Sequence, residues 1–363
     1  MRAAILQTGG VHEEIVPSLV AALGPGWEVS AWLNDKCRAS KGDIFAEVPS
    51  PNLTVHYRAL DGHPAWETLR EDVLAFRPDV VIAATFQRES LAQFIDSLDL
   101  PVLGVIHNLR KAAQAPTVAK LIESGRCQPI VLAEHVRAAF NRSSSGAFID
   151  RIGVVDPVNW GLTGTPDPTC RRIAIPGGVN ATNRDFGGLL AALGPGGPGG
   201  LGRKMAAKGA VIEILGGGPD RARLQCEAAD SGLSELIRFA PLGASGRVHY
   251  GEYLHALRQG WALLPLIPLS KGDYRDFKIT SAIPTAIGFG LPMVLDRWTA
   301  SVYRAPCVTS DVSVAAALEA LLELSEADHN TLKLATCAYR AAALSRNRAE
   351  VARLVSGFGL VAE

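Results

Sequence analysis

The sequence has no excess of either charge and no long apolar run. Its 363 residues include 36 Lys and Arg residues and 36 Asp and Glu residues, so the formal net charge is zero. A nucleic acid as the main partner demands a cationic surface, and this balance argues against it. No segment approaches the ~20 apolar residues of a membrane span, and the apolar run Ala3–Leu6 is too short for a signal peptide. We therefore expect a cytoplasmic protein.

The sequence also has no closely spaced cysteines. The six cysteines are Cys37, Cys127, Cys170, Cys226, Cys307 and Cys337. Without a Cys-x-x-Cys pair a zinc site is not expected. Cysteines scattered through a long chain indicate reduced thiols rather than a disulfide framework.

Short apolar strands alternate with helical patterns along most of the chain, which favours parallel sheets covered by helices on both faces. We expect an α/β protein with two doubly wound, Rossmann-like domains facing across a cleft, where ligands of such folds bind. The first domain is predicted over residues 1–155 and the second over residues 171–330. Residues 156–170, rich in Gly and Pro, are the predicted linker. Residues 331–363 are predicted as helices that pack back on the first domain, and the Gly/Pro-rich residues 194–202 as a mobile surface loop.

A glycine run in the second half indicates a phosphate site. The buried-looking strand Val211–Leu215 runs directly into Gly216, Gly217 and Gly218. A strand that ends in glycines and precedes a helix exposes N–H groups at a positive helix end. Arg221 stands where a dinucleotide fingerprint needs its third glycine, and no Lys-Ser/Thr pair follows, so neither that motif nor a P-loop is complete. A plain strand–helix turn remains the alternative.

The order of motifs in residues 172–296 resembles the donor domain of GT-B glycosyltransferases, and it is most similar to the glycogen-synthase-like group. The matching motifs, in chain order, are Gly177-Gly178, Arg184, Gly216-Gly217-Gly218, Phe239, Pro265 and Gly290-Leu291-Pro292. The resemblance implies transfer of a sugar from a nucleotide-diphosphate sugar to a hydroxyl acceptor: a glycan, a lipid-linked glycan or a small molecule. It covers the N-terminal half by pattern only.

The resemblance also implies binding roles for particular residues. The expected diphosphate ligands are Gly9, Gly10, Arg184, Lys278, Thr280 and Ser281. The expected nucleotide contacts are Gly216, Gly217, Gly218, Phe239 and Pro241, and the expected donor-sugar contacts are Asp273, Tyr274 and Asp276. An ammonium group with hydroxyls and free N–H groups suits a leaving diphosphate. The alternatives are an ordinary helix cap at Lys278 and a surface arginine at Arg184.

Three residues are candidates for catalysis. His12 or Glu13, after the first strand, is expected to deprotonate the acceptor hydroxyl in an inverting reaction. The alternative for Glu13 is a residue that complements a helix dipole. His107 directly follows an apolar strand, where the resembled family often has a histidine near the sugar or acceptor, and its alternative is a structural histidine.

The chain departs from the resembled family at three places. An arginine of that family would fall at Gly178 or Val179. Phe277 and Thr285 fall where that group often carries a pair of glutamates. Retention of anomeric configuration, typical of that group, is therefore not carried over. No Asp-x-Asp triplet occurs, and the fold usually transfers sugar without a metal, so we expect neither a metal nor another cofactor.

Two further readings of the sequence stay open. A basic set, Arg110, Lys111, Lys120 and Arg137, indicates either a peripheral contact with the inner membrane face or a lipid-linked acceptor, or else ordinary solvated charges. The alternative functions are a sugar-nucleotide epimerase of the same fold and a non-catalytic sugar-nucleotide-binding or scaffold protein.

Overall fold

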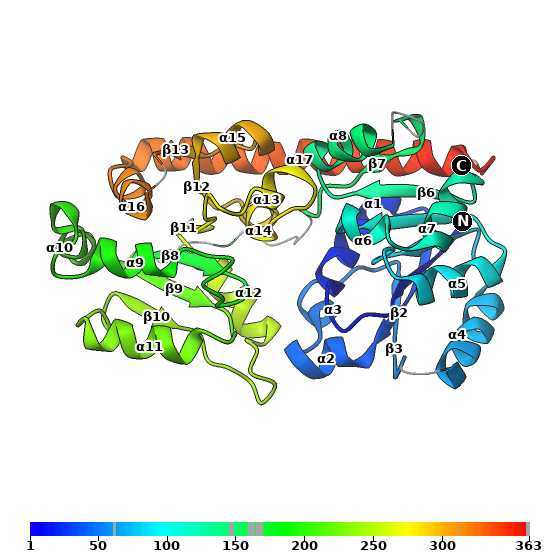
Figure 1. The fold of residues 1–363 in the computed structure, drawn as a ribbon, viewed down its shortest axis with the longest axis horizontal. Helices are drawn as coiled ribbons and strands as arrows, with labels where there is room; N and C mark the ends of the chain where they lie inside the picture. The colour runs from blue at the N-terminus through cyan, green and yellow to red at the C-terminus, as the bar shows by residue number, and fades with distance from the viewer. Residues whose placement is uncertain (61–62, 145–148, 159–163, 165–169, 312, 361–363) are drawn as a thin grey trace. The chain divides into compact units, whose positions relative to one another are not determined.

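The computed structural model describes residues 1–363 except 61–62, 145–148, 159–163, 165–169, 312 and 361–363 (Figure 1). The chain divides into two compact units. Unit 1 comprises Met1–Asn159, Asp273–Ile279 and Ala342–Glu363, and unit 2 comprises Trp160–Gly272 and Thr280–Ala341. The chain therefore passes between the units four times.

Unit 1 contains a seven-stranded parallel sheet in the order β3-β2-β1-β4-β5-β6-β7. Its strands are β1 (Arg2–Gln7), β2 (Glu28–Asn34), β3 (Leu53–Arg58), β4 (Val80–Ala83), β5 (Val102–Ile106), β6 (Cys127–Val131) and β7 (Gly153–Val154). The strand order reverses at β1, as in doubly wound folds, so the loops after β1 and β4 diverge at the carboxyl edge. All residues of β4, β5 and β6 are buried, which explains the continuous apolar sequences of β4 and β5, whereas β6 also buries the polar Gln128.

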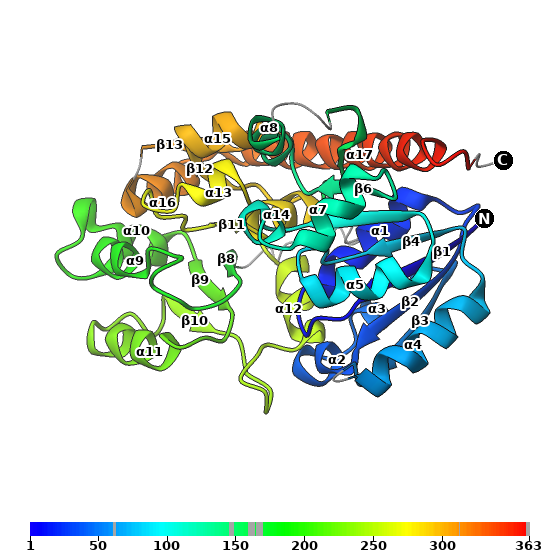
Figure 2. The ribbon, with the colours of Figure 1, turned by 45° about the vertical axis from the view of Figure 1, so that its right-hand side comes forward.

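Helices cover both faces of this sheet. The helices of unit 1 are α1 (Val16–Leu23), α2 (Asp35–Lys41), α3 (Ile44–Glu47), α4 (His63–Phe76), α5 (Glu89–Leu98), α6 (Leu109–Ala112), α7 (Pro116–Glu123), α8 (Glu134–Ser143) and α13 (Asp273–Asp276). Figures 1 and 2 show α4, α5 and α7 along one face, where Leu69, Ile95 and Leu121 enter one buried cluster. On the other face, Leu19 of α1 packs in a cluster with Leu354 near the C-terminus.

Unit 2 contains a four-stranded parallel sheet in the order β10-β9-β8-β11. Its strands are β8 (Arg171–Pro176), β9 (Ala210–Leu215), β10 (Ile237–Phe239) and β11 (Ala262–Leu263), and a separate parallel pair is formed by β12 (Val294–Asp296) and β13 (Val308–Ser310). A parallel bridge from Leu263 to Met293 joins the two sheets.

The helices of unit 2 are α9 (Phe186–Leu193), α10 (Leu201–Ala207), α11 (Arg221–Asp230), α12 (Tyr250–Arg258), α14 (Ala282–Phe289), α15 (Arg297–Tyr303) and α16 (Val314–Leu322). The last helix, α17 (Glu326–Ser356), belongs to unit 2 up to Ala341 and to unit 1 from Ala342. Asp185 caps α9 by accepting a hydrogen bond from the Gly188 amide across 2.8 Å.

The structure confirms the prediction of an α/β chain with two parallel sheets, but corrects it locally. Residues 194–202 are not a loop throughout, because a 3₁₀ turn forms at Pro198–Gly200 and α10 begins at Leu201. Buried Leu201 and Met205 supply the core contacts that composition alone did not reveal. The helix expected from Lys278 begins at Ala282, after the separate short helix α13. Most of the predicted linker 156–170 lies outside the described residues.

Candidate functional site

The loop after β1 is held by buried polar side chains. Gln7, the last residue of β1, is 0% exposed. Its amide oxygen accepts a hydrogen bond from Thr85 Oγ1 across 2.9 Å, and its amide nitrogen donates to the carbonyl oxygen of Val11. Asn34 Nδ2 donates to the Thr8 carbonyl oxygen across 3.0 Å. The loop is thus fixed from three neighbouring strands.

The predicted phosphate glycines Gly9 and Gly10 lie in this loop. A Cβ atom on Gly9 would meet only ordinary contacts, the nearest at 3.7 Å from Gln7 Nε2. A Cβ on Gly10 would lie 3.2 Å from the Cβ of Lys36, a tighter approach. Packing within the described residues therefore does not require glycine at position 9.

The loop brings together His12 and His107, two of the predicted catalytic residues. Their rings stack with centroids 4.3 Å apart and planes inclined by 29°. His12 has φ 76° and ψ 16°, the left-handed region that a non-glycine residue occupies at a cost of about 1 kcal/mol. Nδ1 of His12 lies 3.4 Å from Oε1 of Glu14.

His107 is a neutral imidazole at physiological pH. Its Nε2 lies 2.8 Å from the carbonyl oxygen of Ala84, an acceptor only, so this nitrogen carries the hydrogen. Burial, and next the neighbouring His12, lower the pKa of His107 to about 4. The two histidines therefore lie in different electrostatic environments although their rings touch.

Glu13, the third predicted catalytic residue, faces the interior. It is 1% exposed, and its Oε1 lies 2.7 Å from Nζ of Lys41 on α2. The same ammonium lies 3.8 Å from Oε2 of Glu14. Burial alone would raise the pKa of Glu14, but Lys41 and His12 outweigh burial and hold it far below its ordinary value. The sequence reasoning missed Glu14 and Lys41, although the Glu-Glu pair after a histidine was a visible signal.

The glycines after β8 and β9 pack against one another in unit 2. A Cβ on Gly216 would lie 1.9 Å from the carbonyl oxygen of Gly177, and one on Gly218 would lie 2.3 Å from that of Val179. A Cβ on Gly217 would lie 1.9 Å from the carbonyl oxygen of Gly246. The predicted nucleotide glycines 216–218 are therefore required by backbone packing, whatever they bind.

Gly178 differs from these three glycines. A Cβ there would meet only the carbonyl oxygen of Gly217 at 3.7 Å, an ordinary contact. Its backbone conformation is not in the left-handed region, whereas Gly177 has φ +90°. At the carboxyl edge of unit 2, Gly178 is a glycine that neither packing nor its own conformation explains.

Two buried arginines support these loops. Arg184 is 7% exposed and donates through Nη1 to the carbonyl oxygen of Pro265. Its Nη2 lies 2.7 Å from where a Cβ on Gly177 would be. Arg221 is 6% exposed and donates to the carbonyl oxygens of Gly216 and Ala240, each across 2.6 Å. The sequence marked position 221 only as a missing glycine, not as a support of the loop.

The predicted base contacts lie at the end of β10. The guanidinium carbon of Arg221 lies 5.2 Å from the centroid of the Phe239 ring, which is half-buried. Pro241, two residues beyond, is exposed. Phe239 ends β10 and Pro241 follows it, and the neighbouring strand β9 leads into Gly216–Gly218.

Lys278 belongs to unit 1, in the segment Asp273–Ile279, together with the three predicted sugar contacts. Its ammonium pairs with Asp273 and lies 4.6 Å from the centroid of the Tyr274 ring. Asp276 accepts a hydrogen bond from Arg142 Nη2 across 2.7 Å. Within the segment, the structure thus brings Lys278 together with Asp273 and Tyr274, whereas Asp276 pairs with α8.

Thr280 and Ser281 belong to unit 2 and precede α14. The Thr280 amide donates to the hydroxyl of Tyr303 across 3.1 Å, and the Thr280 side chain is 5% exposed. Ser281 is exposed at the N-terminus of α14. Where the resembled family has glutamates, Thr285 is 2% exposed within α14, and Phe277 packs its ring under Arg110, 4.0 Å from the guanidinium carbon.

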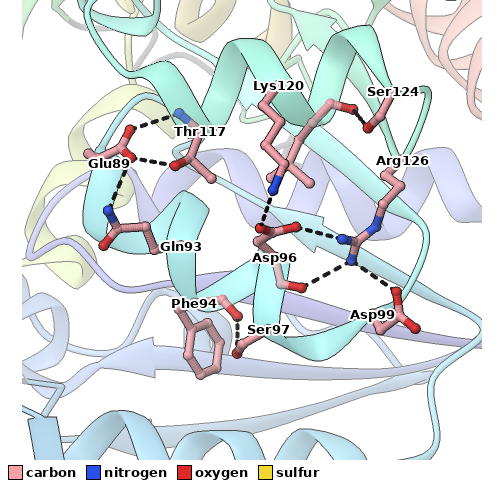
Figure 3. Close-up of polar contacts among 11 residues, drawn as sticks. Glu89, Gln93, Phe94, Asp96, Ser97, Asp99, Thr117, Lys120, Ser124 and Arg126 are labelled. Atoms are coloured by element: carbon pink, nitrogen blue, oxygen red, sulfur yellow. Dashed lines mark hydrogen bonds and ion pairs between the residues drawn. The ribbon is translucent and has the colours of Figure 1, made fainter.

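Most of the predicted basic set is paired. Lys120 Nζ lies 3.1 Å from Asp96, which also pairs with Arg126 (Figure 3). Arg137 lies 2.7 Å from Glu134. With Arg110 on Phe277, three of the four predicted cations have specific partners within unit 1, which agrees with the alternative of ordinary surface charges.

A cavity of about 380 Å³ lies in unit 2 beside the loop after β11. Its lining includes Leu264, Leu266, Val294, Asp296, Ser310 and Val314. None of the predicted site residues lines this cavity. Within the described ranges, no group of three His, Cys, Asp or Glu side chains is placed to hold a metal, and no helix is long and apolar enough to cross a membrane.

Comparison with known proteins supports the fold. No family model matches the sequence, and a search of curated proteins finds no match. Among solved structures, HepE from Anabaena, in complex with UDP and glucose, matches with a TM-score of 0.64 and 11% identity over 98% of this chain and 99% of that chain. Sucrose-phosphate synthase from Thermosynechococcus elongatus matches with a TM-score of 0.57 and 14% identity over 99% and 97% of the two chains.

A UDP-forming α,α-trehalose-phosphate synthase from Burkholderia vietnamiensis matches with a TM-score of 0.56 and 10% identity over 99% and 98% of the two chains. These matches span the whole chain and identify the fold as GT-B, as the motif order predicted. At such identities they show structural similarity to nucleotide-sugar-dependent glycosyltransferases and leave donor and acceptor undetermined.

Proposed function

We propose that this chain is a glycosyltransferase that moves a sugar from a nucleoside-diphosphate sugar to a hydroxyl of its acceptor. The observation that carries the proposal is Gly178, a glycine at the carboxyl edge of β8 that packing does not explain. A phosphate or ribose that approaches the backbone closely explains why no side chain stands there. The GT-B relatives, one of them bound to UDP and glucose, make a nucleotide-sugar the favoured ligand.

The residues divide into supports and contacts. Arg221 holds the turn at Gly216 by donating to its carbonyl oxygen, whereas Arg184 donates to the carbonyl oxygen of Pro265 and lies beside Gly177. Lys278, Thr280 and Ser281 remain the predicted diphosphate ligands, now as a proposal. In this role the Lys278 ammonium moves from Asp273 to the more highly charged diphosphate. There it neutralises the negative charge that develops on the diphosphate as the bond to the sugar breaks.

The proposal is tested by nucleotide binding with a matched pair of glycine variants. Purified protein is heated with each nucleoside diphosphate and nucleotide-sugar, because a ligand that binds only the folded state raises the melting temperature. In Gly178→Ala the added methyl group should abolish the shift without lowering the melting temperature of the free protein. Gly187→Ala is the control, since a Cβ there meets nothing within 4 Å.

A selective shift in the wild type and in Gly187→Ala, lost in Gly178→Ala, supports the proposal and names the base. A shift that survives in Gly178→Ala removes the observation on which the proposal rests. Release of nucleoside diphosphate, measured with and without candidate hydroxyl acceptors, then tests transfer itself.

One observation favours a second candidate, a non-catalytic sugar-nucleotide-binding protein. Phe277 and Thr285 are committed to packing where the resembled family often has glutamates, and Lys278 pairs with Asp273. This candidate predicts the same melting shifts without hydrolysis of the nucleotide-sugar, even after long incubation at high protein concentration.

A further inference from the structure

We infer that Glu14 is the positioning residue of His12, holding the imidazole by Nδ1 so that Nε2 acts as the proton acceptor toward the acceptor hydroxyl. Nδ1 of His12 lies 3.4 Å from Oε1 of Glu14, a long hydrogen bond of the kind that tightens when substrate binds. The catalytic role rests on the proposed function. The pairing of His12 with Glu14 does not, and it is measurable in the free protein.

The backbone of the loop separates the two neighbouring glutamates. His12 adopts the left-handed conformation, and Glu13–Ile15 form a single 3₁₀ turn, in which successive side chains point about 120° apart. Glu13 therefore turns inward to Lys41, while Glu14 remains beside His12. A strained backbone conformation at a non-glycine residue persists where neighbouring contacts hold it in place. Here Gln7 holds the loop by donating to the carbonyl oxygen of Val11, the residue before His12.

Two carboxylates and one ammonium lie close to the ring of His12. Nζ of Lys41 lies 2.7 Å from Oε1 of Glu13 and 3.8 Å from Oε2 of Glu14, and Oε1 of Glu14 lies 3.4 Å from Nδ1 of His12. Burial, and next Glu13, raise the pKa of the Cys37 thiol, which therefore contributes no charge. His107 and Lys36 of α2 also lie beside the loop.

His107 complements this arrangement without competing for the proton. Its Nε2–H is committed to the carbonyl oxygen of Ala84, and its ring covers one face of His12. In this arrangement His107 stays neutral, and the proton of the acceptor moves to His12 alone.

The proton balance of the transfer is complete. The acceptor O–H bond breaks as its proton moves to Nε2 of His12, while Nδ1–H stays with Glu14. The acceptor oxygen then bonds to the anomeric carbon, and the bond from that carbon to the diphosphate oxygen breaks with its electron pair, so the nucleoside diphosphate leaves. The imidazolium returns its proton to water afterwards.

The tautomer of His12 in the wild-type protein is the first test. Long-range ¹H–¹⁵N NMR of the histidine side chains, with His12 assigned by its loss in His12→Gln, distinguishes the two neutral tautomers. We expect the hydrogen on Nδ1 and a bare Nε2. A hydrogen on Nε2 in the neutral ring overturns the inference, and this result does not depend on any variant at position 14.

The second test compares Glu14→Gln with Glu28→Gln, a surface carboxylate that pairs with Arg2. In Glu14→Gln the proton affinity of His12, read from its NMR titration, should fall roughly three- to tenfold. The acid limb of kcat/KM should shift by the same amount, with kcat at least tenfold lower and the donor KM unchanged. Glu28→Gln should match the wild type in all three readouts.

The outcomes separate the two proposals. A His12 titration and an acid limb that are unchanged in Glu14→Gln overturn the role of Glu14, even if the protein transfers sugar. The Nδ1–H tautomer together with the shifted titration, in a protein that turns over no nucleotide-sugar, supports the pairing and contradicts the proposed function instead.

Discussion

His107 donates a hydrogen bond from Nε2 to the carbonyl oxygen of Ala84 across 2.8 Å. This bond holds the ring at the carboxyl edge of unit 1. Burial, and next the neighbouring His12, lower the pKa of His107 to about 4, so the ring is neutral. A histidine in an unfolded chain has a pKa of about 6.5. The unfolded state therefore takes up this proton first as the pH falls.

We expect this difference to make folding stability depend on pH. The contribution of His107 is complete above about pH 6.5 and is lost as the pH falls toward 4, by about 3 kcal/mol in total. His107→Gln, which can still donate to Ala84, should show a shallower loss of stability between pH 6.5 and 4. Urea unfolding at a series of pH values measures both slopes, and parallel curves for the two proteins would contradict the prediction.

Replacement of Arg221 should destabilise unit 2 strongly. Arg221→Met leaves the carbonyl oxygens of Gly216 and Ala240 without their donor in a buried site, which costs about 3 kcal/mol. Arg221→Lys should not rescue, because one ammonium cannot reproduce the fork that reaches both oxygens. The control is Arg223→Met on the same helix, because solvent-exposed ion pairs such as those of Arg223 contribute little to stability. Equal losses in the two Met variants would show that burial of Arg221 has little energetic weight.

A methyl group on Gly217 should break the packing of the loop after β9. Its Cβ would lie 1.9 Å from the carbonyl oxygen of Gly246, a backbone atom that cannot move aside cheaply. We expect Gly217→Ala to lose at least about 2 kcal/mol of stability. Gly187→Ala, in the first turn of α9, should instead be neutral or stabilise by up to about 1 kcal/mol. Thermal unfolding in the absence of any nucleotide separates this effect from ligand binding.

Removal of the Lys278 ammonium should weaken donor binding. In Lys278→Ala we expect the donor KM to rise at least tenfold, because the diphosphate loses its expected cation. Lys120→Ala is the matched control, since that lysine pairs with Asp96 on the surface of unit 1 (Figure 3). Initial rates over a range of donor concentrations give the comparison. A donor KM unchanged in Lys278→Ala would assign the lysine to its pair with Asp273 alone.

The buried side chain of Asn347 should stabilise unit 1. It accepts a hydrogen bond from the Asp156 amide across 2.9 Å and donates to the Asp156 carbonyl oxygen across 2.8 Å. Asn347→Leu leaves both backbone groups without this partner and should cost about 2–3 kcal/mol. Asn330→Leu, at an exposed position of the same helix, should change stability by less than about 0.5 kcal/mol. Denaturant titrations of both variants test the difference.

Much of the fold was predictable because its signals are local. Short, fully apolar runs such as Val80–Ala83 and Val102–Ile106 are typical of buried strands of a parallel sheet, and the structure has both strands. The order of glycines and prolines from Gly177 to Pro292 predicted the GT-B fold that the structural matches share. The prediction of a surface loop over residues 194–202 was wrong, because Leu201 is buried by residues that are distant in the sequence.

The candidate site was only partly predictable. The sequence by itself determined that His12 and His107 follow strands, since strand ends are local features. Only the tertiary structure decided that their rings stack, that Glu13 turns to Lys41, and that Glu14 stays beside His12. Likewise, the glycines at 216–218 were visible in the sequence. The sequence does not say whether the space of their missing side chains is filled by a neighbouring backbone or by a ligand, because this depends on which groups the fold brings within about 3 Å. Those approaches come from residues tens of positions away, and no local pattern encodes them.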